Sequence, residues 1–241
     1  MLRHCRDVLG MTVLAIGFAF LFQATAFATF FIPSESMLPT LQVGDRLTVS
    51  KYAYGWSRYS LPVDLNLELP VSFTGRVFGR DPQRGDIVVF MHPKSGQRMI
   101  KRLIGLPGDR IAMHGGKLYL NGELVSRKHV RSYRYREYHG RLVEVDEFEE
   151  KLGSGDKHRI LLRTRSDAPG RDMDEIIVPP GRYFMLGDNR DNSADSRFPE
   201  MGTVPAENLI GRAEAILYSF YSCEKEQGVT CADRRFATRL D

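Results

Sequence analysis

A long apolar segment dominates the N-terminal part of the chain. Residues 8–34 contain no charged side chain, and a helix that spans a bilayer needs about 20 predominantly apolar residues. The pattern therefore predicts a transmembrane anchor over residues 8–32. The preceding residues 1–7 include Arg3 and Arg6, and basic residues favour the cytoplasmic side of a membrane. We expect a single pass, with the rest of the chain outside the cytoplasm.

A cleavable signal peptide is the alternative interpretation of this segment. Ala24, Ala26 and Ala28 give two small-x-small sites of the kind at which signal peptides are cut. The apolar run nevertheless continues to Ile32, and it is longer than the roughly 7–15 apolar residues of a signal peptide. We therefore favour an uncleaved anchor.

After the anchor, the hydrophobic pattern has the period of strands rather than helices. Apolar and polar residues alternate, or short β-branched runs lie between turn-forming residues. Asn121-Gly122 is the strongest short signal for a hairpin turn. The pattern predicts a mainly β, antiparallel fold, with strands within residues 41–52, 84–93, 97–113, 115–125, 176–198 and 210–221.

A change in composition divides the β region. Residues 126–175 are polar and weakly periodic, so we predict an inserted β/loop region there. It separates two parts of one β domain, residues 33–125 and 176–222, and residues 223–241 are expected to be a C-terminal tail. Basic side chains and tyrosines alternate in the insertion in a way that a nucleic-acid site can show. Because this part is expected to be exported, we interpret it as solvated surface and expect no nucleic-acid partner.

Composition and charge exclude few classes of protein. The chain has 241 residues, a net charge of +4, and 42% hydrophobic and 27% charged residues, all ordinary for a folded protein. None of Cys5, Cys223 and Cys231 forms a CxxC pair or lies at metal-ligand spacing from a histidine, so we expect no metal and no cofactor. In an oxidising compartment Cys223 and Cys231 can form a disulfide. Two unlinked thiols are equally compatible with the sequence.

Three segments have a composition that core packing does not explain. The first, residues 32–40 (IPSESMLPT), follows the anchor directly. Pro33 and Pro39 end the helix and stiffen the chain, and Ser34 and Ser36 lie where the chain leaves the membrane. Taken alone, this composition is typical of any segment that follows a membrane helix.

The second segment contains Lys101 within a predicted strand. Alternate residues of a strand share a face, so Lys101 lies beside the apolar Met99 and Leu103. Loss of hydration there favours the neutral amine and lowers its pKa from about 10.4, which would make it a competent base near neutral pH. The neighbouring Arg102 cannot serve, because a guanidinium does not lose its proton in proteins. From this segment alone, a lysine that reaches water at a strand edge is the simpler interpretation.

The third segment is residues 187–197 (GDNRDNSADSR), which consists mostly of Asp, Asn, Arg and Ser. Such a loop can form a rigid hydrogen-bonded scaffold. It lacks the spaced carboxylates and closing glutamate of an EF-hand calcium loop.

Together the three segments closely resemble the signature motifs of bacterial type I signal peptidases, a family of Ser-Lys peptidases. The similarity keeps the same order over residues 30–113 and 176–215, and it includes the anchor and its orientation. The resemblance implies an antiparallel, barrel-like signal peptidase fold with one N-terminal transmembrane helix. It also implies a serine endopeptidase that removes signal peptides through an acyl-enzyme intermediate.

The resemblance assigns roles to individual residues. Ser36 precedes the methionine of S-M-x-P-T and matches the nucleophile, and Lys101 matches the general base. The Ser34 hydroxyl and the Ser36 backbone N–H match the two donors of the oxyanion hole. Among the supporting positions, Ser193 matches the serine that orients the lysine amine, Asp195 and Arg197 match an ion pair, and Gly187, Asp188 and Asn192 match residues that shape the site.

The same resemblance implies the setting of the reaction. Its substrates would be exported preproteins whose signal peptides end in an Ala-x-Ala pattern. The implied location is the inner (plasma) membrane, in contact with the lipid bilayer, with the catalytic domain on the periplasmic or extracytoplasmic side.

The sequence departs from the family pattern at three places. Glu35 stands between the two serines, where the family commonly has glycine, and its carboxylate either faces solvent or disturbs the cleft. Residues 198–205 form a longer link than is usual. No motif covers the insertion at residues 126–175.

Other functions fit the sequence less well. A Ser-His-Asp hydrolase lacks its G-x-S-x-G motif, and Ser154–Lys157 match S-x-x-K without the K-T-G of penicillin-binding enzymes. A self-cleaving repressor would need DNA-binding helices. A peptidase that matures a conjugative pilin stays an alternative, as does an anchored binding module without activity, although the presence of both Ser36 and Lys101 argues against the latter.

Overall fold

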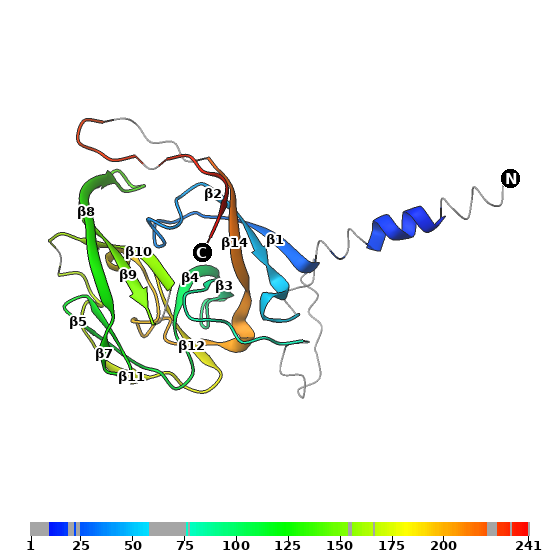
Figure 1. Ribbon diagram of the computed structural model, residues 1–241, viewed down its shortest axis with the longest axis horizontal. Coiled ribbons are helices and arrows are strands. Elements are labelled where there is room, and N and C mark those ends of the chain that lie inside the picture. The colour runs from blue at the N-terminus through cyan, green and yellow to red at the C-terminus, as the bar shows by residue number, and fades with distance from the viewer. Residues whose placement is uncertain are drawn as a thin grey trace.

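The structure is a computed structural model that describes residues 10–18, 22, 25–57, 76, 78–153, 156–165, 167–220, 226–231 and 233–240. Within these residues the chain is mainly β (Figure 1), and the paired strands are antiparallel throughout. The prediction of a mainly antiparallel β fold is confirmed.

The largest sheet carries the parts of the chain that contain the candidate residues. Its strands follow the order β1-β2-β14-β3-β4-β12-β13, and β15 pairs with β14. Their bounds are β1 Phe27–Phe31, β2 Asp45–Ser50, β3 Ile87–Met91, β4 Arg98–Gly105, β12 Arg182–Leu186, β13 Val204–Pro205, β14 Leu209–Ser219 and β15 Phe236–Arg239.

Two smaller sheets and three short 3₁₀ helices accompany the large sheet. One sheet has the order β11-β5-β6-β7 and the other β10-β9-β8. The bounds are β5 Arg110–His114, β6 Lys117–Leu120, β7 Glu123–Leu124, β8 Ser126–Arg136, β9 Leu142–Leu152, β10 Asp156–Arg163, β11 Met173–Ile177, η1 Lys51–Tyr54, η3 Arg190–Asn192 and η4 Ala206–Asn208. The Asn121-Gly122 turn lies between β6 and β7, as predicted.

The predicted anchor is described only in part. Residues 10–18 are helical, whereas residues 8–9, 19–21 and 23–24 lie outside the described residues. Within the described part, none of the helices combines the length and the hydropathy that crossing a bilayer requires. The predicted end of the helix is wrong, because Phe27–Phe31 form strand β1. Aromatic and β-branched residues suit a strand, and the backbone of β1 pairs with β2.

The insertion is more regular than its polarity suggested. The charged side chains of β8 are all basic and those of β9 are acidic except Lys151, and the register of the two strands sets opposite charges side by side. Cross-strand pairs of opposite charge stabilise a sheet. The pairing accounts for the basic run without a nucleic-acid ligand; it matches Arg127 with Glu150, Lys128 with Glu149, Arg131 with Glu147 and Arg134 with Glu144.

The end of the insertion and the structure of the C-terminal tail differ from the prediction. β11 crosses the predicted limit at residue 175 and pairs with β5, so the insertion ends earlier. The expected C-terminal tail contains β15, which pairs with β14. Arg235, also in the tail, donates to the Thr40 carbonyl at 2.6 Å and pairs with Asp45.

Cys231 is disulfide-bonded. This bond excludes two free thiols, the alternative that the sequence left open. The other two cysteines, Cys5 and Cys223, lie outside the described residues.

The hydrophobic core holds the loop that carries Ser36 against the large sheet. Met37 and Leu41 are buried in a cluster with Leu47, Val49 and other residues of β2, β3 and β14. Burying side chains of this size stabilises each by roughly 1.5–3 kcal/mol. The loop between β1 and β2 is therefore fixed on the sheet, next to β4.

Candidate active site

The loop that carries Ser36 is closed by hydrogen bonds at its base. The Ile32 N–H donates to the Asp45 carbonyl at 2.9 Å, and the Gly44 N–H donates to the Ile32 carbonyl at 2.9 Å. The Asp45 carboxylate accepts from the Gln42 N–H at 2.8 Å. With its ends joined and Met37 buried, the loop presents Ser36 toward β4.

Lys101 and Ser36 meet in the structure. The Lys101 Nζ lies 2.7 Å from the Ser36 Oγ, and only 2% of Lys101 and 8% of Ser36 are exposed. The amine also donates to the Ile100 carbonyl at 3.0 Å. Lys101 therefore does not reach water from a strand edge, which was the simpler interpretation of its segment.

The surroundings of Lys101 favour a neutral amine. Burial lowers the pKa of Lys101 to about 8, and the Arg197 guanidinium acts in the same direction, while the carboxylates of Asp195 and Asp188 oppose the shift. A buried ammonium loses its hydration, and this is the largest cause. At a pKa near 8, a substantial fraction of the amine can accept a proton near neutral pH.

Each of the two carboxylates near Lys101 is paired with an arginine. Arg197 donates to Asp195 from Nε at 2.8 Å and from Nη2 at 2.9 Å. Arg102 donates to Asp188 from Nε at 2.9 Å and from Nη2 at 2.8 Å. Since a guanidinium offsets each carboxylate charge, their attraction for a proton on Lys101 is reduced. The desolvation of the amine then determines its pKa.

The predicted oxyanion donors lie on the same loop. The Ser34 Oγ is 3.3 Å from the Ser36 Oγ. Among the described residues the Ser36 N–H has no hydrogen-bond partner, whereas the Ser36 carbonyl accepts from the Asn189 N–H at 3.1 Å. A free N–H on Ser36 and a hydroxyl on Ser34, two residues earlier, are the kind of donors that stabilise an oxyanion.

Gly187 is required by a close approach of two segments. A Cβ at this position would lie 2.2 Å from the Ser193 Oγ and 2.5 Å from the Ser36 carbonyl oxygen. The Gly187 N–H donates to the Asp195 carboxylate at 3.0 Å. The residue therefore lets the segment after β12 pack against the backbone of Ser36.

Ser193 does not make the predicted contact with Lys101. Its hydroxyl is buried and has no hydrogen-bond partner in the described part of the chain. Lys101 instead uses the carbonyl of its neighbour Ile100, and the Ser193 side chain packs over Gly187. The orienting role of Ser193 stays a prediction that this geometry does not support.

Glu35 neither faces solvent freely nor blocks the cleft. Its carboxylate accepts from the Tyr138 N–H at 2.8 Å and from the Asn192 side chain at 3.3 Å. Asn192, one of the predicted site-shaping residues, thus acts on the loop through Glu35. A pocket of about 310 Å³ opens beside these groups; it is lined by Pro33, Ser34, Glu35, Ser36, Met99, Lys101, Tyr138, His139, Asn192 and Ala194.

Three contributing residues were not assigned a role from the sequence. Arg102 was noted only as unable to act as a base, yet it pairs with Asp188. Its place on an apolar strand face was a signal, because a buried cation needs a partner. Thr40 also donates to Asp188, and Asn189 holds the Ser36 and Glu35 carbonyls through its N–H and its side chain. Nothing local in the sequence indicates these last two contacts.

The competing sites receive no support from the geometry. Lys157 of the S-x-x-K match pairs with Glu149 at 3.1 Å, and Ser154 lies outside the described residues. Across the part of the chain that the structure describes, no cluster of His, Cys, Asp and Glu could hold a metal ion.

Comparison with known proteins identifies the family. The family described as signal peptidase, peptidase S26, matches residues 5–218. The signal peptidase I of Rickettsia bellii (strain OSU 85-389) is 38% identical over 214 residues, which are 86% of this chain and 71% of that protein. This chain belongs to the signal peptidase family, peptidase S26.

A further relative agrees with that assignment. The signal peptidase I of Pseudomonas aeruginosa is 41% identical over 203 residues, covering 79% of this chain and 64% of that protein. A crystal structure of a signal peptidase I from Enterococcus faecalis V583 is 28% identical, covers 55% of this chain and 97% of that chain, and gives a TM-score of 0.33. The assignment rests on the sequences, and the resemblance seen in the three motifs is confirmed. The chain is accordingly a serine peptidase that removes signal peptides.

Gly187→Ala should disturb both the fold and the site. The added methyl group would overlap the Ser36 carbonyl oxygen and Ser193, and overpacking of this kind typically costs about 1–3 kcal/mol. We expect a lower free energy of unfolding in urea and a large loss of peptidase activity. Gly79→Ala is the matched control, since the nearest atom to its Cβ would be 3.7 Å away. Equal stability and activity of the two variants would contradict the close approach described here.

Proposed function

We propose that this chain cleaves signal peptides with a Ser36–Lys101 dyad, while it is anchored in the membrane by its N-terminal segment. The observation that carries the proposal is the contact of 2.7 Å between the buried Lys101 Nζ and the Ser36 Oγ. A serine hydroxyl is a weak nucleophile until a base removes its proton. A neutral amine at this distance can do so without a histidine.

The first half of the reaction forms an acyl-enzyme. The Ser36 Oγ attacks the scissile carbonyl carbon as its proton passes to the Lys101 Nζ. The Ser34 hydroxyl and the Ser36 N–H stabilise the negative charge that develops on the carbonyl oxygen, and one such donor is typically worth about 10²–10³ in rate. When the C–N bond breaks, Lys101 returns the proton to the leaving amine.

The second half of the reaction releases the signal peptide. Lys101, neutral again, removes a proton from a water molecule, and the water oxygen attacks the ester carbon. The same two donors stabilise the second oxyanion. The ester bond to Ser36 then breaks, the proton returns from Lys101 to the Ser36 Oγ, and the free carboxylate leaves.

The pocket beside the dyad supports a preference for small side chains. Pro33, Met99 and Ala194 give it an apolar wall, and its volume of about 310 Å³ lies at the lower end for ligand pockets. This wall and the family resemblance together support exported preproteins with Ala-x-Ala type signal peptides as the substrates.

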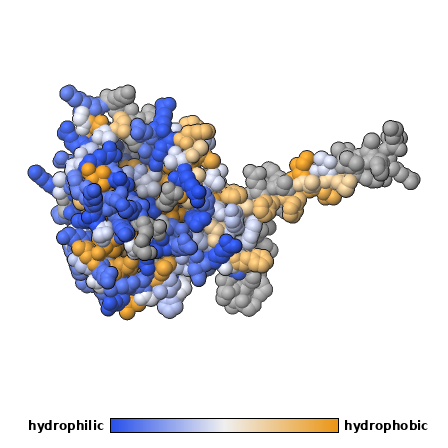
Figure 2. Space-filling view, viewed as in Figure 1, coloured by the Kyte–Doolittle hydropathy of each residue, from blue (hydrophilic) through white to orange (hydrophobic). Residues whose placement is uncertain are grey.

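The exposed apolar residues of the N-terminal helix support attachment to a bilayer. Met11, Val13, Leu14, Ile16 and Phe18 are all more than half exposed. Figure 2 shows this apolar segment extending from the largely hydrophilic body of the molecule. A helix that is apolar on all sides is suited to a protein core or to lipid. Ser36 follows β1 by five residues, so the proposal places the dyad at the outer surface of the inner (plasma) membrane.

Substitution of either dyad residue tests the mechanism. We expect Ser36→Ala and Lys101→Ala to lower kcat/KM for a leader peptide by at least about 10²–10⁴-fold, the usual contribution of a general base. Lys101→Arg should be equally inactive because a guanidinium keeps its proton. Lys94→Ala serves as the control, since Lys94 is exposed and its side-chain amine donates to the Pro199 carbonyl at 2.7 Å. Retained cleavage by Lys101→Arg would exclude Lys101 as the base.

The pH dependence of cleavage follows from the lowered pKa of Lys101. The neutral amine is the reactive form, so activity should rise with pH and level off above about 8. Below that value the rate should fall about tenfold for each pH unit, in proportion to the neutral fraction. The measurement is kcat/KM between about pH 6 and pH 9.5, with a peptide that has no ionisable group in this range. A flat profile, or a decrease with rising pH through 8, would be incompatible with the proposed base.

A further inference from the structure

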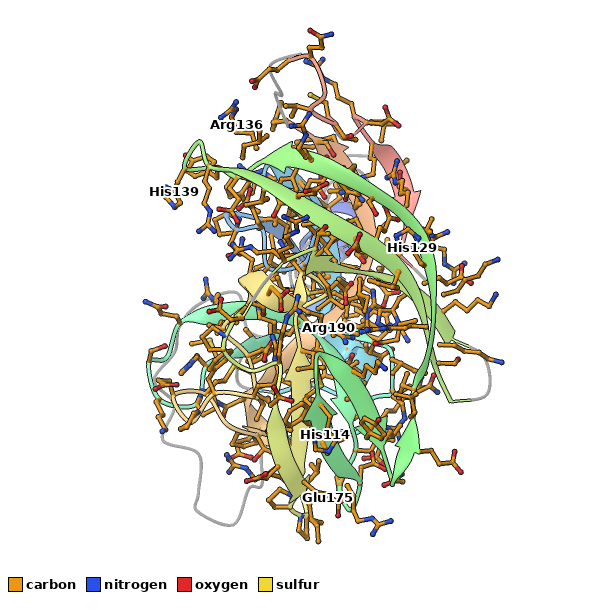
Figure 3. The ribbon with its side chains drawn as sticks, turned by 90° about the vertical axis from the view of Figure 1, so that its left-hand side faces the viewer. His114, His129, Arg136, His139, Glu175 and Arg190 are labelled. Atoms are coloured by element: carbon orange, nitrogen blue, oxygen red, sulfur yellow. The ribbon has the colours of Figure 1, made fainter. Side chains whose placement is uncertain are left out.

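The tip of the β8–β9 hairpin, residues 137–141, lies at the far end of the insertion from its attachment to β7. The Glu137 N–H donates to the Arg141 carbonyl at 2.8 Å, and the Gly140 N–H donates to the Glu137 carbonyl at 2.7 Å. Figure 3 shows His139 at this tip, where the two long strands meet. We call these five residues the hairpin tip.

The hairpin tip reaches the dyad. Tyr138 and His139 line the same pocket as Ser36 and Lys101, although about a hundred residues separate Tyr138 from the nucleophile loop in the sequence. The insertion is therefore part of the wall of the candidate active site.

Glu35 holds the hairpin tip in this position. The carboxylate accepts from the Tyr138 N–H at 2.8 Å and stands directly between Ser34 and Ser36 in the chain. Burial raises the pKa of Glu35, and the hydrogen bond from the Tyr138 N–H opposes that shift. A glycine at this position, which is common in the family, would have no side chain to bind the tip.

Further contacts hold the hairpin from several parts of the fold. Arg163 of β10 donates to the Glu137 carboxylate at 2.6 Å, and Asn189 donates to the Tyr135 hydroxyl at 3.1 Å. Leu38, two residues after the nucleophile, packs against the small apolar cluster of the insertion. The tip is thus rigidly placed, and a preorganised wall binds at a lower entropic cost than a mobile one.

The aromatic side chains of the tip remain available to a ligand. Tyr138 is 72% exposed, and the ring contact that the structure gives it is the edge of His139, at 5.5 Å between centroids. Tyrosine offers a large contact area at a low entropic cost and is enriched in recognition surfaces. An exposed Tyr-His pair at the rim of the pocket is suited to contact with an extended peptide.

We propose that the hairpin tip is a substrate-recognition element, in which Tyr138 and His139 contact the preprotein side chains that flank the scissile bond and Glu35 is the positioning residue. The inference rests on the proposed function and deepens it. It assigns the insertion a part in selecting the substrate. The expected ligands are apolar or aromatic side chains close to the cleaved bond, which pack against the two rings.

Photo-crosslinking tests the contact directly. The full chain in detergent, with Ser36→Ala to prevent turnover, would carry p-benzoylphenylalanine in place of Tyr138 or His139. The probe is a biotinylated synthetic leader peptide with one Ala-x-Ala site. We expect crosslinks from both positions and none from the same residue in place of Lys128, which is exposed on β8. Crosslinking at the tip no stronger than at Lys128, with peptide binding shown by fluorescence polarisation, would overturn the inference.

Kinetic selectivity provides a measurement that does not depend on the photoreactive group. Two leader peptides would share the Ala-x-Ala pattern and differ only in the residue after the scissile bond, alanine in one and phenylalanine in the other. Tyr138→Ala and His139→Ala should change the ratio of their kcat/KM values by about tenfold, the size expected for a lost pocket contact. Lys128→Ala should leave the ratio unchanged. Unaltered ratios in both tip variants would contradict the proposed contact.

Variants of Glu35 distinguish a role in positioning the hairpin tip from a general loss of structure. Glu35→Gln retains an acceptor for the Tyr138 N–H, whereas Glu35→Ala removes it. Hydrogen exchange at residues 137–141 should become faster only in Glu35→Ala, and only that variant should lose the selectivity. Identical exchange and selectivity in both variants would exclude the positioning role. Wild-type cleavage of the leader peptide is measured in parallel, so that a failure of the proposed function is recognised as distinct from a failure of the tip inference.

Discussion

The site depends on the burial of one amine against one hydroxyl. Lys101 belongs to β4, between β3 and β12, and its side chain reaches Ser36 on the loop between β1 and β2. Lowering its pKa from about 10.4 to about 8 corresponds to an unfavourable term on the order of 3 kcal/mol for the charged form. The well-packed strands around it offset that cost, because the hydrophobic core fixes β4 and the nucleophile loop independently of the amine.

The charges near Lys101 are arranged so that they do not cancel the lowering of its pKa. Asp188 and Asp195 would each stabilise a protonated lysine, and each is held in a two-point contact by an arginine. Burial alone would raise the pKa of Asp188, but the charge and hydrogen bonds of Arg102 bring it below its ordinary value. Asp188 therefore stays ionised and hydrogen-bonded to Arg102. The two arginine pairs and the absence of a side chain at Gly187 let the segment after β12 close over the dyad.

Several of these features were predictable because their signals are local. The alternation of Met99, Lys101 and Leu103 marked a cation among apolar groups, and the turn at Asn121-Gly122 marked a hairpin. The contact of Lys101 with Ser36 spans 65 positions, and it was expected only from the family resemblance. The end of the anchor was misplaced because a short apolar run such as Phe27–Phe31 can be a helix or a strand.

Long-range contacts explain what the sequence did not reveal. The partners of Glu35 lie 103 and 157 positions away, so its role in binding the hairpin tip has no local signature. The residues of β15 were interpreted as part of a tail. The strand is short, and its partner β14 can be identified only from the folded chain. The predicted contact of Ser193 with Lys101 was carried over from the family pattern, whereas here the Ile100 carbonyl takes that place on the amine.

The most direct test of the account is the pKa of the Lys101 amine itself. Lysines labelled with ¹³C at Cε would be titrated by NMR in the full chain, and Lys101→Arg would identify the resonance. The account predicts a midpoint near 8 for Lys101. A midpoint near 10.4, the ordinary value for lysine, would leave less than about 0.1% of the amine neutral at pH 7 and would contradict the proposed dyad.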